Sequence, residues 1–139
     1  MSFINGFDIA ASALSAQRTR LTVTASNLAN AETTRTAEGG AYQRQQVVFQ
    51  TAAARFGDTL NDAAVSRVEV AGVQADQRDM RLVWDPEHPD ARPDGYVEYP
   101  NVNVVEEMAE MVVASRSYEA NVTSFETLKK MALRALNIG

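Results

Sequence analysis

Residues 7–28, FDIAASALSAQRTRLTVTASNL, decide the fold because a large apolar residue stands at every seventh position: Phe7, Leu14, Leu21 and Leu28. This spacing is typical of a helix that packs one narrow face against another helix. Small residues that permit close helix contact stand beside this row: Ala10, Ala11, Thr24 and Ala25. The sequence therefore predicts a helix over residues 3–30, with Asn30 as its C-terminal cap.

A second helix is predicted at the other end of the chain. Asn103 is a good N-cap, and Glu106 stands three residues later, where a capping box has its reciprocal partner. Apolar and small residues then follow at spacings of three and four: Val104, Met108, Met111, Ser115, Tyr118, Val122, Phe125, Ala132 and Leu136. Neither helix can bury its stripe alone, so each must pack against the other or against a neighbouring molecule.

The residues between the two helices lack a helical period. Apolar and polar residues alternate around 47–49 and 68–70, and residues 82–84 and 96–99 are rich in β-branched and aromatic side chains. These patterns predict short strands. Residues 85–95 contain three prolines and a glycine, which predicts a loop. We expect a small, partly open sheet in this middle region.

Charge and composition exclude several classes of protein. The net charge is −5, and all of the excess lies in residues 32–100, which hold seven basic and twelve acidic side chains. Nucleic-acid binding is not expected, because the phosphate backbone requires a basic surface. No apolar run is long enough to span a bilayer, so we expect no direct membrane insertion. The chain has no cysteine, and its start lacks the features of a Sec signal peptide.

The expected helix lengths indicate the shape of the molecule. At 1.5 Å per residue the helices would be roughly 40 and 50 Å long. A compact globule of this chain length has a diameter of about 37 Å. Both helices exceed it, so we expect an elongated subunit whose exposed helix faces need partners.

Other functions are possible from the residues alone. Loop 85–95 could form a metal site from the side chains of Asp85, Glu87, His88 and Asp90. The same residues also suit a solvated loop that is stiffened by proline. No serine or acid is placed to form a catalytic triad with His88, the only histidine. We expect a protein without enzymatic activity, cofactor or metal.

Five stretches resemble the flagellar basal-body rod and hook family: 7–14 (FDIAASAL), 25–31 (ASNLANA), 45–50 (QQVVFQ), 95–105 (GYVEYPNVNVV) and 115–122 (SRSYEANV). The family's aromatic-basic pair is matched by Tyr42-Gln43-Arg44, displaced by extra residues around Gly39 and Gly40. This displacement is similar to the proximal-rod C-type proteins rather than to the distal-rod or hook proteins. Another rod or hook component is the alternative within the family.

The resemblance implies a structural role and a location. Such proteins leave the cell through the flagellar type III export apparatus without a cleaved signal. They stack helically, with copies of themselves and with other rod proteins, into the rod that crosses the periplasm. The rod transmits torque as a drive shaft around the export channel. A self-contained ligand- or metal-binding domain that uses loop 85–95 is the alternative from another class.

The resemblance also implies an α+β fold with three parts. Residues 1–31 and 101–139 would be long terminal helices packed as in a coiled coil, and residues 32–100 a small β-rich domain that faces outward. We expect these residues at the assembly interface: Phe7, Leu14, Leu21, Asn27, Leu28, Asn30, Met108, Met111, Tyr118, Asn121, Val122, Phe125 and Leu136. Phe7, Leu14, Leu21 and Leu28, which we call the leucine row, could from the residues alone equally close a monomer; with the helix lengths and the resemblance we expect this row to pack both within and between subunits. Asn27 and Asn121 could set register or lie on the surface.

Overall fold

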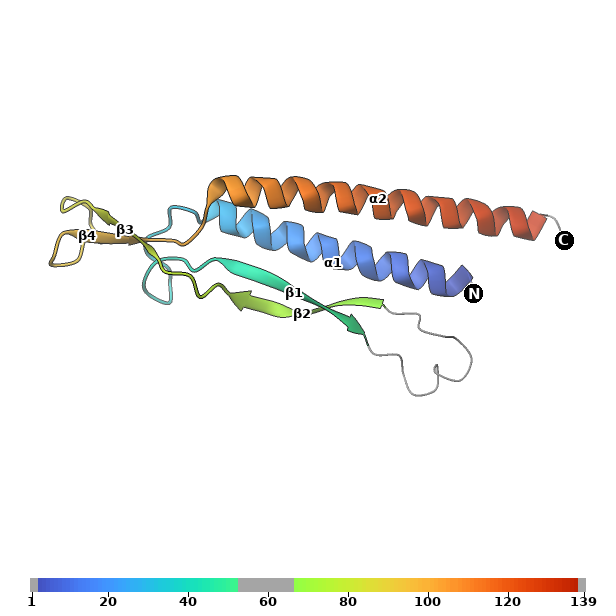
Figure 1. Ribbon diagram of the computed structural model, residues 1–139, viewed down its shortest axis with the longest axis horizontal. Coiled ribbons are helices and arrows are strands. Elements are labelled where there is room, and N and C mark those ends of the chain that lie inside the picture. Colours follow the sequence, from blue (N-terminus) through green and yellow to red (C-terminus); the bar gives the residue numbers. More distant parts are fainter. Residues whose placement is uncertain (1–2, 53–66, 138–139) are drawn as a thin grey trace.

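The computed structural model describes residues 3–52 and 67–137 and shows an α+β fold of two long helices and four strands (Figure 1). The elements in chain order are α1 (Phe3–Ala29), β1 (Gln45–Ala52), β2 (Arg67–Ala75), β3 (Arg81–Trp84), β4 (Tyr96–Tyr99) and α2 (Val104–Asn137). Both predicted helices and all four predicted strands are confirmed. Residues 53–66, in a stretch without family signature, lie outside the described residues.

Helices α1 and α2 lie side by side and run in opposite directions (Figure 1). The rings of Phe7 and Phe125 meet edge to face, with their centroids 5.0 Å apart. The most deeply buried apolar residues of the two helices are small: Ala10, Ala16 and Ala114. Small side chains let two helix backbones approach closely, as predicted for Ala10 and Thr24. The other two small residues in that prediction, Ala11 and Ala25, are exposed instead.

The predicted caps are present at the end of α1 and at the start of α2. At the end of α1, Asn30 donates from its side-chain amide to the Ser26 carbonyl at 2.9 Å. At the start of α2, Asn103 accepts the backbone N–H groups of Val105 and Glu106 at 3.0 and 3.5 Å. The predicted reciprocal role of Glu106 is replaced by an ion pair, because Glu106 accepts from Arg78 at 3.3 Å.

Strands β1 and β2 form an antiparallel hairpin that lies along α1, on the side away from α2 (Figure 1). The pairing runs from Gln45 opposite Ala75 to Ala52 opposite Arg67, with an irregularity between Val48 and Phe49. Arg67 also forms an ion pair with Asp8 of α1 at 3.0 Å. Helix α1 is therefore covered on one side by α2 and on another by this hairpin.

Strands β3 and β4 form a second antiparallel pair, which lies beyond the start of α2 and away from both chain ends (Figure 1). Residues 85–95 connect them as the predicted loop. Gly95 has a φ of 83°, and a Cβ there would come within 3.2 Å of the Trp84 ring nitrogen. The prediction of one partly open sheet was wrong: the four strands form two separate pairs. In each pair the two strands follow one another along the chain, which is how strands most often pair.

The molecule has a large surface for its length. Its accessible area is 9883 Å², whereas a compact monomer of this size exposes about 7,100 Å². Among the described residues, the buried apolar side chains are few and mostly small: Ala10, Ala16, Ala31, Val97 and Ala114. The elongated shape expected from the helix lengths is thus confirmed, and the chain has little hydrophobic core of its own.

Candidate assembly interface

The predicted leucine row of α1 lies partly buried in the folded subunit. Phe7, Leu14, Leu21 and Leu28 are each neither fully buried nor exposed. Phe7 contacts Phe125, so these two predicted interface residues meet within one chain. Gln17 interrupts the row, and its side-chain oxygen is buried without a hydrogen-bond partner among the described residues. The row thus contributes to the closed helix pair and keeps part of its surface accessible.

The predicted residues of α2 divide into two groups. Met111, Asn121, Val122 and Phe125 are partly buried, as are the α1 residues above. Met108, Tyr118 and Leu136 are exposed, and Leu136 is 78% accessible. The structure therefore brings the first group toward the helix pair and leaves the second group on the surface of the subunit.

A second apolar row on α2 was not singled out by the sequence. Val105, Met108 and Val112, which we call the outer row, are spaced three and four residues apart and so share one helix face. All three are exposed, and Met108 is 55% accessible. Glu107 and Ala114, on a different face of the same helix, are fully buried. The outer row is therefore an apolar helix face that no other described residue of the subunit covers.

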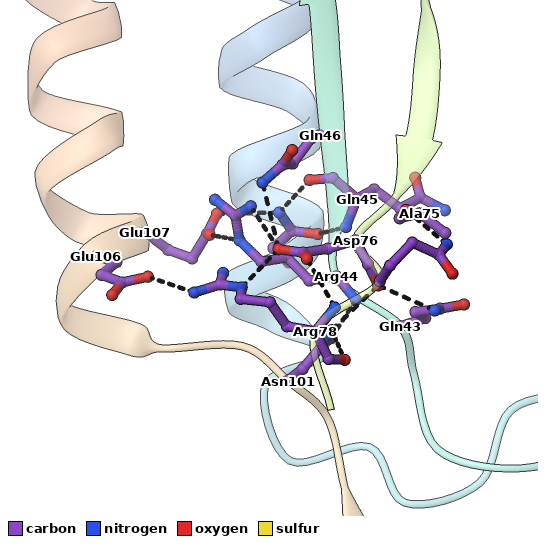
Figure 2. A network of polar contacts seen from close by, with 12 residues as sticks. Gln43, Arg44, Gln45, Gln46, Ala75, Asp76, Arg78, Asn101, Glu106 and Glu107 are labelled. Carbon is purple, nitrogen blue, oxygen red and sulfur yellow. Dashed lines mark hydrogen bonds and ion pairs between the residues drawn. The ribbon is translucent and has the colours of Figure 1, made fainter. Parts of the chain in front are cut away.

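A cluster of charged and amide side chains joins the elements where both helices meet the strands (Figure 2). We call it the polar junction, and it consists of Asn27, Arg44, Asp76, Arg78, Asn101 and Glu107. Arg44 lies at its centre, just before β1. Its guanidinium donates to Glu107 of α2 at 2.6 Å, to Asp76 after β2 at 3.2 Å and to Glu110 at 3.3 Å. One side chain thus links α2 to both strands of the first hairpin.

Asn27 connects α1 to the same cluster. Its side-chain amide donates to Glu107 at 3.0 Å and to the Gln45 carbonyl at 2.8 Å. Its oxygen accepts from the Gln45 backbone and from the Tyr42 hydroxyl, both at 2.9 Å. Only 1% of Asn27 is accessible. The Asn27 side chain therefore makes its contacts inside the subunit. It lies neither on the surface nor where another subunit could reach it.

Asp76 ties the segment after β2 to the cluster. Its carboxylate accepts from the Arg78 backbone and guanidinium at 3.0 and 2.8 Å and from Gln46 at 3.2 Å. The Asn101 amide donates to the carbonyls of Asp76 and Arg78, and its oxygen accepts the Arg44 backbone N–H at 2.8 Å. The segments before β3 and after β4 are thereby joined to each other and to Arg44.

The electrostatic environment favours the charged forms of the central groups. Burial alone would lower the pKa of Arg44, but the hydrogen bond and charge of Glu107, with Glu110 and Asp76, raise it. Burial would likewise raise the pKa of Asp76, but hydrogen bonds from Arg78, its charge and the bond from Arg44 lower it. Asp76 and Arg44 therefore stay ionised and paired at neutral pH.

Little in the amino-acid sequence indicates the polar junction. Arg44 stood out only as part of a family signature, and no spacing in the sequence indicated Glu107 as its partner. The signal that could have indicated Glu107 is its place in the series 107, 114, 121 and 128, which follows a heptad spacing through buried Ala114. A charged residue on the inner face of a helix requires a buried partner of opposite charge.

Loop 85–95, the alternative metal site, is held by contacts within the chain. Asp90 accepts from Thr34 at 2.9 Å and from Arg35 at 3.4 Å. The His88 ring nitrogen accepts the Asp90 backbone N–H at 3.1 Å. Within residues 3–52 and 67–137, no group of three or more histidine or acidic side chains is arranged to hold a metal ion. Neither described helix is long and apolar enough to cross a membrane.

Two family models match the ends of the chain. The model described as "Flagella basal body rod protein" matches residues 7–36, which include most of α1. The model described as "Flagellar basal body rod FlgEFG protein C-terminal" matches residues 94–138, which include β4 and α2. The matched segments are thus those that form the helix pair and its junction with the strands.

Curated relatives match over the full length. The chain is 46% identical over 139 residues to the "Flagellar basal-body rod protein FlgC" of Salmonella typhimurium, covering 100% of this chain and 99% of the relative. Proteins of the same description from Escherichia coli O6:H1 and Bacillus subtilis are 48% and 41% identical, again over 100% of this chain and 99% of each relative. The similarity therefore extends through the strands as well as the helices.

Proposed function

The chain belongs to the flagellar basal-body rod family, in its proximal-rod C-type branch, and from this premise we propose that it assembles through the surfaces of its helix pair into a helical shaft. It is a structural subunit of the rod, located in the flagellar basal body, and it interacts with other rod components. The finer proposal concerns how it does so: by many repeated helix contacts with copies of itself and with other rod subunits.

The observation that supports this proposal is the large apolar surface on an elongated subunit. Apolar side chains are exposed along α2 and at both ends of the molecule, as the outer row, Trp84 and Leu136 illustrate. Monomeric proteins rarely expose so many large apolar groups unless another molecule covers them. Together with the small buried core, this indicates a subunit completed by its neighbours.

The proposed mechanism is mechanical and involves no catalysis. The polar junction fixes the first hairpin to the helix pair, so torque applied to one part of the subunit is transmitted to the rest. We propose that residues 1–31 and 101–139 form an inner layer around the export channel and that residues 32–100 lie outside it. Passage through the type III export apparatus without a cleaved signal, and a position across the periplasm, complete the proposal.

The test uses an exposed interface residue, because its substitution leaves the inner packing of the subunit intact. We expect Met108→Asp to remove the protein from isolated basal bodies and to abolish swimming, since a carboxylate in an apolar contact is strongly unfavourable. Thr123→Asp, also exposed on α2, is the matched control. Leu21→Asp and Val122→Asp should block assembly too, but these residues are partly buried and also support the helix pair.

The purified variants are compared by thermal unfolding before any conclusion is drawn. A Met108→Asp protein that unfolds at the parental temperature and is missing from basal bodies supports the interface. Normal incorporation and swimming of that same variant would show that the outer row is not an assembly surface.

A further inference from the structure

The second hairpin presents an apolar surface at one end of the molecule. Trp84, the only tryptophan, is 66% accessible, and Leu82 and Tyr96 are also exposed. This hairpin end, residues 81–99, lies beyond the helix pair (Figure 1). Exposed tryptophan and tyrosine are costly to leave in water and are enriched where proteins meet. The hairpin end therefore has the composition of a docking surface.

The opposite end of the molecule is also apolar. Near the C-terminus of α2, Met131, Leu133 and Leu136 are all exposed. This helix end, residues 125–137, reaches past the start of α1 in Figure 1. The two exposed apolar surfaces thus lie at opposite ends of one elongated subunit, where a neighbour along the long axis would meet them.

The two ends carry opposite charge. The hairpin end holds five acidic and two basic residues, and the helix end holds one acidic and three basic residues. None of the ion pairs between described residues involves Lys129, Lys130 or Arg134 of the helix end, nor Asp85 or Glu87 of the hairpin end. These charges are free to pair across an interface, and complementary charge favours one orientation of docking.

We propose that the hairpin end docks on the C-terminal end of the equivalent helix in a neighbouring rod subunit. The proposal rests on the proposed function and adds the contact that joins subunits end to end. The partner surface is apolar with a basic rim, and the Trp84 ring packs into it. The family model that matches residues 94–138 is described for other rod proteins, so this helix segment is shared within the rod. A contact between two different surfaces of this kind extends an open chain of subunits whenever its rotation does not close a ring.

The experiment places a photo-crosslinking amino acid, p-benzoylphenylalanine, at position 84 in cells that lack the parental protein. After irradiation, basal bodies are isolated and the crosslinked peptides are identified by mass spectrometry. We expect peptides from the basic, apolar C-terminal helix of a rod subunit, either this one or a related one. The same probe at Val112, an exposed position in the outer row, should capture different peptides.

Charge reversal tests the electrostatic part of the contact. Asp85→Lys with Glu87→Lys should lower the crosslink yield at position 84 roughly three- to tenfold. Glu38→Lys, an exposed acidic residue outside the hairpin end, is the control and should leave the yield unchanged.

The outcomes separate this inference from the proposed function. A protein that is incorporated into basal bodies, but whose position 84 crosslinks to other segments or to nothing, overturns the end-to-end contact and leaves the rod assignment intact. A folded position-84 variant that is absent from basal bodies, while the Thr123→Asp control is present, supports a requirement for the hairpin end. Absence of every folded variant, the Glu38→Lys control included, would instead count against the proposed function.

Discussion

At the scale of single residues, Arg44 holds the subunit in its shape. Its side chain is 4% accessible and donates to three carboxylates that come from two different parts of the chain. Arginine suits this place because its planar group presents five donors in a fixed geometry, whereas lysine offers a single flexible point charge. Glu107, fully buried, depends on this partner and on Asn27.

Replacing Arg44 with methionine should therefore destabilise the protein strongly. The change leaves the Glu107 carboxylate buried without its cation, which costs roughly 3–5 kcal/mol in comparable cases. The free energy of unfolding is measured by urea denaturation of the purified protein. Arg67→Met is the control, since Arg67 pairs with Asp8 on the surface, where a pair contributes about 1 kcal/mol or less. Equal losses from the two substitutions would contradict the assigned role of Arg44.

The lowered pKa of Asp76 leads to a prediction for how the free energy of unfolding depends on pH. Its pKa in the folded protein lies below the ordinary value of 3.8, so its contribution is fully present above that value. The contribution is lost as the pH falls through the lowered folded-state pKa. The difference in unfolding free energy between the parent and Asp76→Asn should thus be constant from pH 7 to about pH 4 and shrink below it. A difference for Asp76→Asn that stays constant at every pH would refute the link.

The polar junction also shows why sequence reasoning missed part of the site. Arg44 contacts residues 32 to 66 positions away, so no local spacing could have paired them. Asn27 was left between two interpretations because its partners Tyr42, Gln45 and Glu107 meet only in the folded chain. Periodicity finds the faces of helices, whereas a buried charge network depends on tertiary contacts.

At the scale of elements, the helices were the most predictable part of the fold. The predicted first helix, residues 3–30, differs from α1 by one residue, and the Asn103 cap marks the start of α2. The choice of inner face was less predictable. The most deeply buried residues of the helix pair include alanine and threonine, whereas Met108 and Leu136 are exposed, so apolar size alone does not mark the inner face. The strands were found from alternation and from β-branched and aromatic residues, but their grouping into two separate pairs was not predicted.

The cap of α2 provides a test at this scale. Asn103→Ala should destabilise the protein by about 1 kcal/mol, because the N–H groups of Val105 and Glu106 lose their acceptor. Asn103→Asp retains an oxygen at the same place and should be nearly neutral, as a matched control. Thermal unfolding followed by circular dichroism measures both. An Asn103→Asp variant as unstable as Asn103→Ala would mean that the side-chain amide, rather than the cap, matters.

At the scale of the whole molecule, the subunit is an elongated body with little core. Helix α2 alone, with 34 residues, is about 50 Å long, and the second hairpin extends the molecule further at one end (Figure 1). Such a shape exposes the faces that a compact protein would bury. Neighbouring rod subunits are therefore expected to cover the apolar surface that a single chain leaves exposed.

This shape can be measured on the free protein. A compact chain of 139 residues has a radius of gyration of about 14 Å. Small-angle X-ray scattering of a dilute monomer should give a value well above this, because the helix pair and the second hairpin lie in line. Extrapolation to zero concentration, with light scattering to verify the mass, serves as the control. A radius near 14 Å would mean that the free chain folds back on itself.

The polar junction also has a kinetic consequence. Asn27 and Glu107 are separated by 80 residues, and Arg44 and Glu107 by 63. A chain that is made from its N-terminus cannot complete these contacts until α2 has begun to emerge, and contacts between such distant residues form slowly. The contact that ties the first helix to the last one, between Asn27 and Glu107, therefore forms late. The contacts that make the subunit rigid are thus completed only when its final helix has been made.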